Sequence, residues 1–242
     1  MEDENIYEKI EDALGHSPGN ISILEEQIDI DLQVEYFEFA RELKKNPVNA
    51  DIPELSKKLF DCGFPAEEKK RLLARLAASE EVAAYRAIER YLGNPDAELR
   101  DWAVLAFQES RMVIQSRLLD EDQVFISTGL GGKGSGLRYF VVLISSSGKQ
   151  FSGFQRKLVR TEFDYHLKNC GAEAEEICFM DNFCSLLAVL PVRAPVRDVF
   201  REAVAECNQY GGFLSEKFIV TNVKKLSYEE IKEFISEKDK EE

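Results

Sequence analysis

Closely spaced metal ligands are missing from this chain. It has only two histidines, His16 and His166, and none of its five cysteines lies three positions from another. Zinc sites draw on closely spaced Cys and His side chains, so we expect no metal centre and no bound cofactor. An odd number of scattered cysteines favours free thiols in a reducing compartment over a disulfide framework.

Long apolar runs are missing as well. No stretch approaches the roughly 18 consecutive apolar residues of a membrane-spanning helix, so no membrane partner is predicted. The first residues, Met1-Glu-Asp-Glu-Asn-Ile, are acidic and lack the positive charge and apolar core of a signal peptide. Together with the thiols, this predicts a cytoplasmic protein.

Positive charge is scarce in the first half of the chain. Residues 1–121 hold 15 Lys and Arg against 27 Asp and Glu, a net charge of −12. Residues 122–242 hold 16 against 18, a net charge of −2. We therefore expect the first half to repel nucleic acid, whereas the second half permits a surface that faces a polyanion.

The first half has the pattern of a helical repeat. Apolar spacing predicts helices, which are bounded by glycines and prolines that recur at an offset of 30 residues: Gly63 with Gly93 and Pro65 with Pro95. Units of this kind bury their apolar sides by stacking on one another. The predicted helices cover residues 4–14, 21–45, 52–62, 66–78, 80–92 and 96–118, and Asp96 is expected to cap the last of them.

Residues 94–106, Asn-Pro-Asp-Ala-Glu-Leu-Arg-Asp-Trp-Ala-Val-Leu-Ala, resemble the second half of a HEAT-type repeat. In that family a Pro-Asp turn precedes a helix that carries an arginine and then a small residue, here Pro95, Asp96, Arg100 and Ala103. The resemblance extends over about residues 50–118. It implies a curved helical stack that binds proteins or, less often, nucleic acids, and it implies no catalysis.

The second half reads as a mixture of strands and helices. Its predicted order is β-β-α-β-β-α-β followed by a helix, which indicates an antiparallel sheet with two helices on one face. This order resembles that of ferredoxin-like folds. The predicted strands are 124–128, 137–145, 175–180, 183–192 and 218–223, and the predicted helices are 151–169, one from Pro195 and one from Leu226. The fold class is therefore α+β, with an all-α domain at 1–120 and an α+β domain at 121–242.

A glycine-rich segment, Gly129-Leu-Gly-Gly-Lys-Gly-Ser-Gly136, joins the first two strands of the second half. It is not a phosphate-binding P-loop, because Lys133 is followed by glycine and a strand comes next rather than a helix. Five glycines exceed what a hairpin turn needs, so we expect a close approach by a ligand, another chain or the helical stack. The candidate binding residues are Gly131, Gly132, Lys133, Gly134 and Arg138, with Arg156 and Arg160 from the basic helix.

The function predicted from these patterns is that of a non-enzymatic cytoplasmic adaptor or scaffold with a protein partner. The alternative is a module that binds RNA or a phosphate ligand through the glycine-rich hairpin. Tyr139 and Phe140 weaken the RNA alternative, because neighbouring strand residues point to opposite faces and cannot form a joint stacking platform. An enzyme is the third hypothesis, and no residue is assigned a catalytic role, since no nucleophile accompanies His166.

Overall fold

The computed structural model describes residues 21–45, 51–120 and 123–238. These residues form two compact units with separate cores. Unit 1 contains residues 21–24 and 28–126, and unit 2 contains residues 127–238 together with the short segment Glu25–Gln27. The helix expected at residues 4–14 lies outside the described residues.

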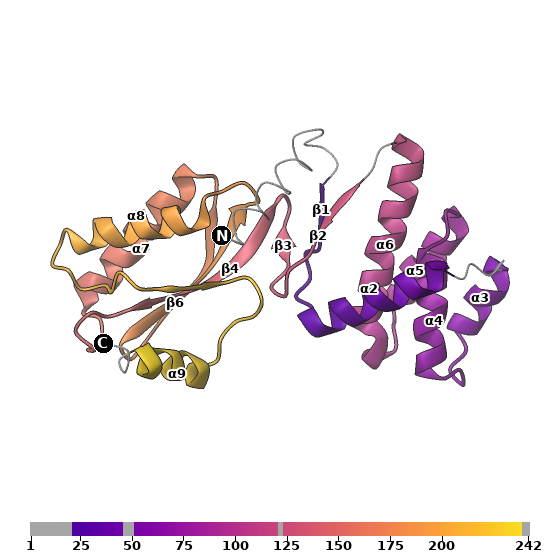
Figure 1. The fold of residues 1–242 in the computed structure, drawn as a ribbon, viewed down its shortest axis with the longest axis horizontal. Coiled ribbons are helices and arrows are strands. Elements are labelled where there is room, and N and C mark those ends of the chain that lie inside the picture. The colour runs from indigo at the N-terminus through magenta and orange to yellow at the C-terminus, as the bar shows by residue number, and fades with distance from the viewer. Residues whose placement is uncertain (1–20, 46–50, 121–122, 239–242) are drawn as a thin grey trace. The chain divides into compact units, whose positions relative to one another are not determined.

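Helices build most of unit 1. In chain order they are α2 (Ile30–Lys45), α3 (Ile52–Leu59), α4 (Ala66–Ala77), α5 (Val82–Leu92), the 3-10 turn η1 (Ala97–Leu99) and α6 (Arg100–Leu119). Both α4 and α5 pack along α6 (Figure 1). The shared core includes Leu73, Ile88 and Trp102, each at most 1% exposed. Trp102 is therefore a core residue of unit 1.

Asp96 has another role than the predicted helix cap. Its side chain makes no capping hydrogen bond at η1. Instead its carboxylate accepts hydrogen bonds from the ammonium of Lys69 at 2.7 Å and from the hydroxyl of Tyr91 at 2.6 Å. The Lys69 side chain is only 5% exposed, and a buried cation needs a counter-charge. The hydrogen bond from Lys69 is also the main cause that lowers the pKa of Asp96.

A small parallel sheet corrects three predictions. Strand β1 (Ile21–Ile23) pairs with β2 (Val124–Ile126), with Ile21 opposite Val124. Unit 1 is therefore not all-α, the predicted helix 21–45 begins only at Ile30, and the 124–128 strand does not form a hairpin with 137–145. Both strands are short apolar runs with β-branched residues, and each finds its partner about a hundred positions away.

Unit 2 is built on an antiparallel sheet. Its elements are β3 (Gly132–Lys133), β4 (Gly136–Ile144), α7 (Gly153–Asn169), β5 (Glu173–Met180), β6 (Phe183–Pro191), α8 (Val196–Asn208), β7 (Ile219–Thr221) and α9 (Tyr228–Lys238). The strand order is β3-β4-β6-β5, and β7 also pairs with β4. The chain is therefore an α+β protein with a mostly antiparallel sheet.

Helices cover both faces of this sheet. Both α7 and α8 lie on one face, where Phe163 and Phe200 are fully buried (Figure 1). On the opposite face α9 contributes Ile231 to a smaller cluster with Phe140 and Val142. Tyr139 packs against the α7/α8 cluster instead, so the two neighbouring aromatic residues of β4 do lie on opposite faces. None of the described helices is both long and apolar enough to cross a membrane.

Candidate functional site

The tip of the glycine-rich segment is a tight hairpin between β3 and β4. Gly132 pairs with Leu137 and Lys133 pairs with Gly136, which leaves a two-residue turn of Gly134 and Ser135. Gly134 has a φ of +59°, in the left-handed region that such turns require. A Cβ atom at Gly134 would meet nothing within 4 Å, so this glycine is needed for its backbone angle alone.

Gly131 is needed because another part of the same unit lies against it. Its φ is +64°, and a Cβ atom built there would lie 2.5 Å from the carbonyl oxygens of both Glu25 and Glu26. The amide of Gly134 also donates a hydrogen bond to the carboxylate of Glu25 at 3.0 Å. The close approach predicted from the glycines therefore comes, at Gly131, from the segment Glu25–Gln27 of this chain.

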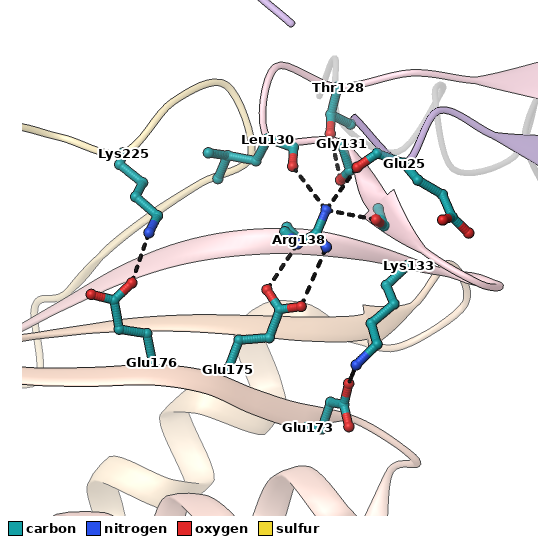
Figure 2. Close-up of polar contacts among 11 residues, drawn as sticks. Glu25, Thr128, Leu130, Gly131, Lys133, Arg138, Glu173, Glu175, Glu176 and Lys225 are labelled. Carbon is teal, nitrogen blue, oxygen red and sulfur yellow. Dashed lines mark hydrogen bonds and ion pairs between the residues drawn. The ribbon is translucent and has the colours of Figure 1, made fainter. Parts of the chain in front are cut away.

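Arg138 holds this arrangement together (Figure 2). Its Nε and Nη2 donate to the two carboxylate oxygens of Glu175 at 2.8 and 3.3 Å. Its Nη1 donates to the carbonyl oxygens of Gly132 at 2.6 Å and Glu25 at 2.8 Å. The Arg138 and Glu175 side chains are 17% and 22% exposed. The guanidinium thus joins β4, β5, the hairpin and the 25–27 segment.

The other cations near the hairpin also have carboxylate partners (Figure 2). The Lys133 ammonium lies 2.5 Å from Glu173, and the Lys225 ammonium lies 2.7 Å from Glu176. The hydrogen bond that Lys133 donates to Glu173 raises the pKa of Lys133, and the hydrogen bond that Lys225 donates to Glu176 lowers the pKa of Glu176. Acidic residues of β5 therefore form ion pairs with the cations near the hairpin, which include the residues predicted to bind a phosphate.

The two remaining predicted residues lie elsewhere. Arg156 and Arg160 are on α7, where both guanidinium groups lie over the ring of Phe179, with ring-centroid distances of 5.6 and 5.2 Å. Phe179 packs into the core beneath α7 and α8. The predicted site is thus divided between the hairpin and this helix.

Unit 1 contains an open groove that the sequence did not reveal. Its volume is about 540 Å³, and its apolar floor is formed by half-buried side chains. The groove lies between α2, α6 and β2, which only the folded chain brings together. The lining residues are Phe37, Lys44, Glu80, Glu109, Met112, Val113, Ser116, Arg117, Asp120 and Phe125.

A buried carboxylate forms part of the groove wall. Glu109 accepts hydrogen bonds from the hydroxyl of Tyr36 at 2.5 Å and from the ammonium of Lys44 at 2.6 Å. Tyr36 is fully buried. Burial raises the pKa of the Tyr36 phenol well above its ordinary value, and the charge of Glu109 raises it further. Tyr36 is therefore a neutral donor that fixes the position of Glu109.

This arrangement predicts a pH dependence of stability. The folded pKa of Tyr36 lies above its unfolded value of about 10, so the stabilisation is complete below pH 10. Above that pH the unfolded chain ionises first, and the free energy of unfolding falls by up to about 1.4 kcal/mol per pH unit from this group. Tyr36→Phe should lower the free energy of unfolding by about 1–3 kcal/mol at neutral pH, because Glu109 loses a hydrogen-bond donor. Above pH 10 the free energy of unfolding of this variant should fall less steeply with pH than that of the wild type. Urea unfolding followed by Trp102 fluorescence measures the free energy of unfolding of wild type and Tyr36→Phe at each pH. If this free energy fell equally in the two proteins above pH 10, Tyr36 would not be the group that causes the fall.

No metal site was found in the part of the chain that the structure describes. Within residues 21–45, 51–120 and 123–238, no three His, Cys, Asp or Glu side chains are grouped so that they could hold an ion.

Comparison with known proteins adds little to this α+β description. No protein-family model matches the chain, and no curated protein matches it. Among the solved structures that match is one described as a candidate transposase, from Deinococcus radiodurans R1. It has 14% sequence identity and a TM-score of 0.37, and the match covers 44% of this chain and 93% of that one. A likeness of this degree carries no argument about fold or function.

Proposed function

We propose that this chain is a non-enzymatic, cytoplasmic protein-interaction protein that binds its partner in the groove of unit 1. The observation that carries the proposal is the apolar floor formed by Phe37, Met112, Val113 and Phe125, which is open at the surface. Exposed apolar surface of this kind, bordered by charged residues, is typical of sites for another protein. The protein would act as an adaptor or scaffold.

The two units support finer architectural proposals. In unit 1 the packing of α4 and α5 along α6 is consistent with a HEAT-like helical stack. In unit 2 the order β4-α7-β5-β6-α8-β7, with strands arranged β7-β4-β6-β5, supports a ferredoxin-like fold. Such folds serve many functions, so the groove carries the functional argument and the fold names do not.

The charges around the groove favour a partner segment with apolar anchors and a basic residue. Lys44 is paired with Glu109, and Arg117 is paired with Glu80 at 3.3 Å. Asp120 has no hydrogen bond or ion pair through its side chain with any other described residue. A lysine or arginine at this end of the bound segment would complement the Asp120 carboxylate.

The hairpin gives no comparable support to phosphate or RNA binding. Lys133 and Arg138 each face a carboxylate, and Arg138 donates in addition to carbonyl groups of its own chain. A phosphate at this position would have to displace those partners.

The proposal is tested by affinity purification from the native cell with full-length bait proteins. Val113→Arg places a charge on the groove floor at a half-buried position. Leu118→Arg makes the same kind of change on the same helix at a side chain that is 76% exposed and outside the groove lining. We expect a partner to be captured by the wild type and by Leu118→Arg, and to be lost with Val113→Arg.

Cross-linking to the groove should then identify the bound segment. The proposal requires that this segment contain apolar residues beside a lysine or arginine, and that Asp120→Lys weaken its capture. Trp102 fluorescence of each bait checks that unit 1 remains folded. Equal capture by folded Val113→Arg and wild type, or no partner at all, would refute the proposal.

A further inference from the structure

Several of the described cations of unit 2 form ion pairs with carboxylates. The paired residues are Lys133, Arg138, Lys168, Arg201, Lys224, Lys225 and Lys232. Four exposed cations at or just before the first half of α7 have no ion pair with any described residue: Lys149, Arg156, Lys157 and Arg160. We call these four residues the α7 patch.

Two of these cations are held in place without being neutralised. Arg156 donates through Nε to the carbonyl oxygen of Phe151 at 3.0 Å, and Arg160 donates through Nη2 to the carbonyl oxygen of Ile177 at 3.2 Å. Both guanidinium groups also lie over the Phe179 ring. Each keeps further N–H groups that can donate to an anion. Fixing these side chains before binding reduces the entropy lost on binding.

An exposed aromatic ring lies on the same side of α7 as Lys157, one of the four patch residues. Phe154 is 63% exposed and precedes Lys157 by three residues, so both occupy the same side of α7. The Lys157 ammonium makes no hydrogen bond or ion pair with any residue that the structure describes. Proteins that bind single-stranded nucleic acid combine a cationic track for the backbone with aromatic side chains on which bases stack.

The neighbouring sheet edge argues against an acidic peptide that adds a strand to β5. The β5–β6 pairing is irregular between Ala174 and Glu176, and bulges of this kind protect sheet edges. In addition, Arg160 donates a hydrogen bond to the carbonyl oxygen of Ile177 in β5. A partner can therefore bind the patch through its positive charge and the aromatic ring, but not by pairing as an added strand with β5.

From these contacts we propose that the α7 patch and Phe154 bind the phosphate backbone and a base of single-stranded nucleic acid. This site is separate from the groove of unit 1, and either proposal can fail without the other. The chain as a whole has a net charge of −14. Because electrostatic effects are screened over about 8 Å at physiological ionic strength, the local charge of the patch decides binding there.

The experiment measures binding of the full chain to a fluorescent oligothymidylate of about 12 nucleotides, a length within known site sizes. With three phosphates contacted, the logarithm of the binding constant should fall against the logarithm of salt with a slope of about −2. Lys157→Glu should weaken binding at least about fivefold, and Phe154→Ala about tenfold.

Lys168→Glu is the matched control, because it makes the same change of charge on the same helix at a lysine paired with Asp164. It should alter binding less than about twofold, as should Lys133→Glu at the hairpin. Absence of binding in low salt would overturn the proposal. So would equal losses in Lys157→Glu and Lys168→Glu, equal affinity of Phe154→Ala and wild type, or binding to phosphatidylserine vesicles but not to the oligonucleotide.

Discussion

Gly131→Ala is expected to destabilise unit 2 by about 2–4 kcal/mol. A left-handed backbone costs alanine about 1–2 kcal/mol, and the new Cβ atom would in addition lie 2.5 Å from two backbone carbonyl oxygens. Since these atoms belong to Glu25 and Glu26, relief of the overlap requires the 25–27 segment to move. Hydrogen exchange of the β4 and β6 amides measures the loss in unit 2, and Trp102 fluorescence reports unit 1 separately.

Gly134→Ala is the matched control for this prediction. Its φ of +59° is nearly the same, but its Cβ atom would meet nothing within 4 Å. The expected cost is therefore about 1–2 kcal/mol, from the backbone angle alone. If the two variants lost equal stability, the close contact between Gly131 and the backbone of Glu25 and Glu26 would be contradicted.

Arg138→Met should also destabilise unit 2, by about 2–4 kcal/mol. Methionine fills much of the same volume, but it leaves the Glu175 carboxylate and the carbonyl groups of Gly132 and Glu25 without their donor. Arg138→Lys should recover only part of the loss, because an ammonium group cannot reproduce the paired contact with Glu175. The same exchange experiment measures both variants.

Lys133→Met serves as the comparison for Arg138. Lys133 makes its ion pair with Glu173 in solvent, where such pairs contribute little. The β4 amides of this variant should exchange at nearly the wild-type rate. A loss in Lys133→Met as large as that in Arg138→Met would show that the exposed ion pair of Lys133 stabilises the hairpin as much as the half-buried guanidinium of Arg138 does.

Local signals in the sequence predict most of the elements. Gly63, Pro65, Gly93 and Pro95 mark helix boundaries within unit 1, and the observed helices α3 to α6 lie at or near the predicted ranges. In unit 2 the apolar strands and their intervening helices follow the predicted order. These features depend on residues within a few positions of one another, which a linear pattern contains.

Contacts over long sequence distances account for the errors. The β1–β2 pair joins Ile21 to Val124, and the hydrogen bond from Gly134 to Glu25 joins residues 109 positions apart. No periodicity in the sequence connects such segments. The excess of glycine correctly indicated a close approach to the hairpin, but it could not indicate that the approaching chain is Glu25–Gln27.

The candidate sites show the same limit. Arg138 is predicted from the sequence to contact a ligand, and the sequence gives no sign that its guanidinium also donates to Glu175 and to carbonyl groups of its own chain. The groove of unit 1 was missed, since Phe37, Val113 and Phe125 come from three elements and each alone has the pattern of a core residue. Sites of this type depend on tertiary contacts.

One comparison tests the proposed function most directly. Wild type, Val113→Arg and Lys133→Ala are each used as full-length bait in the native cell, and captured proteins are quantified. We predict that the partner is retained by Lys133→Ala and lost with Val113→Arg, because the groove of unit 1 binds it. Loss with Lys133→Ala and retention by Val113→Arg would contradict this account and place the partner at the glycine-rich hairpin.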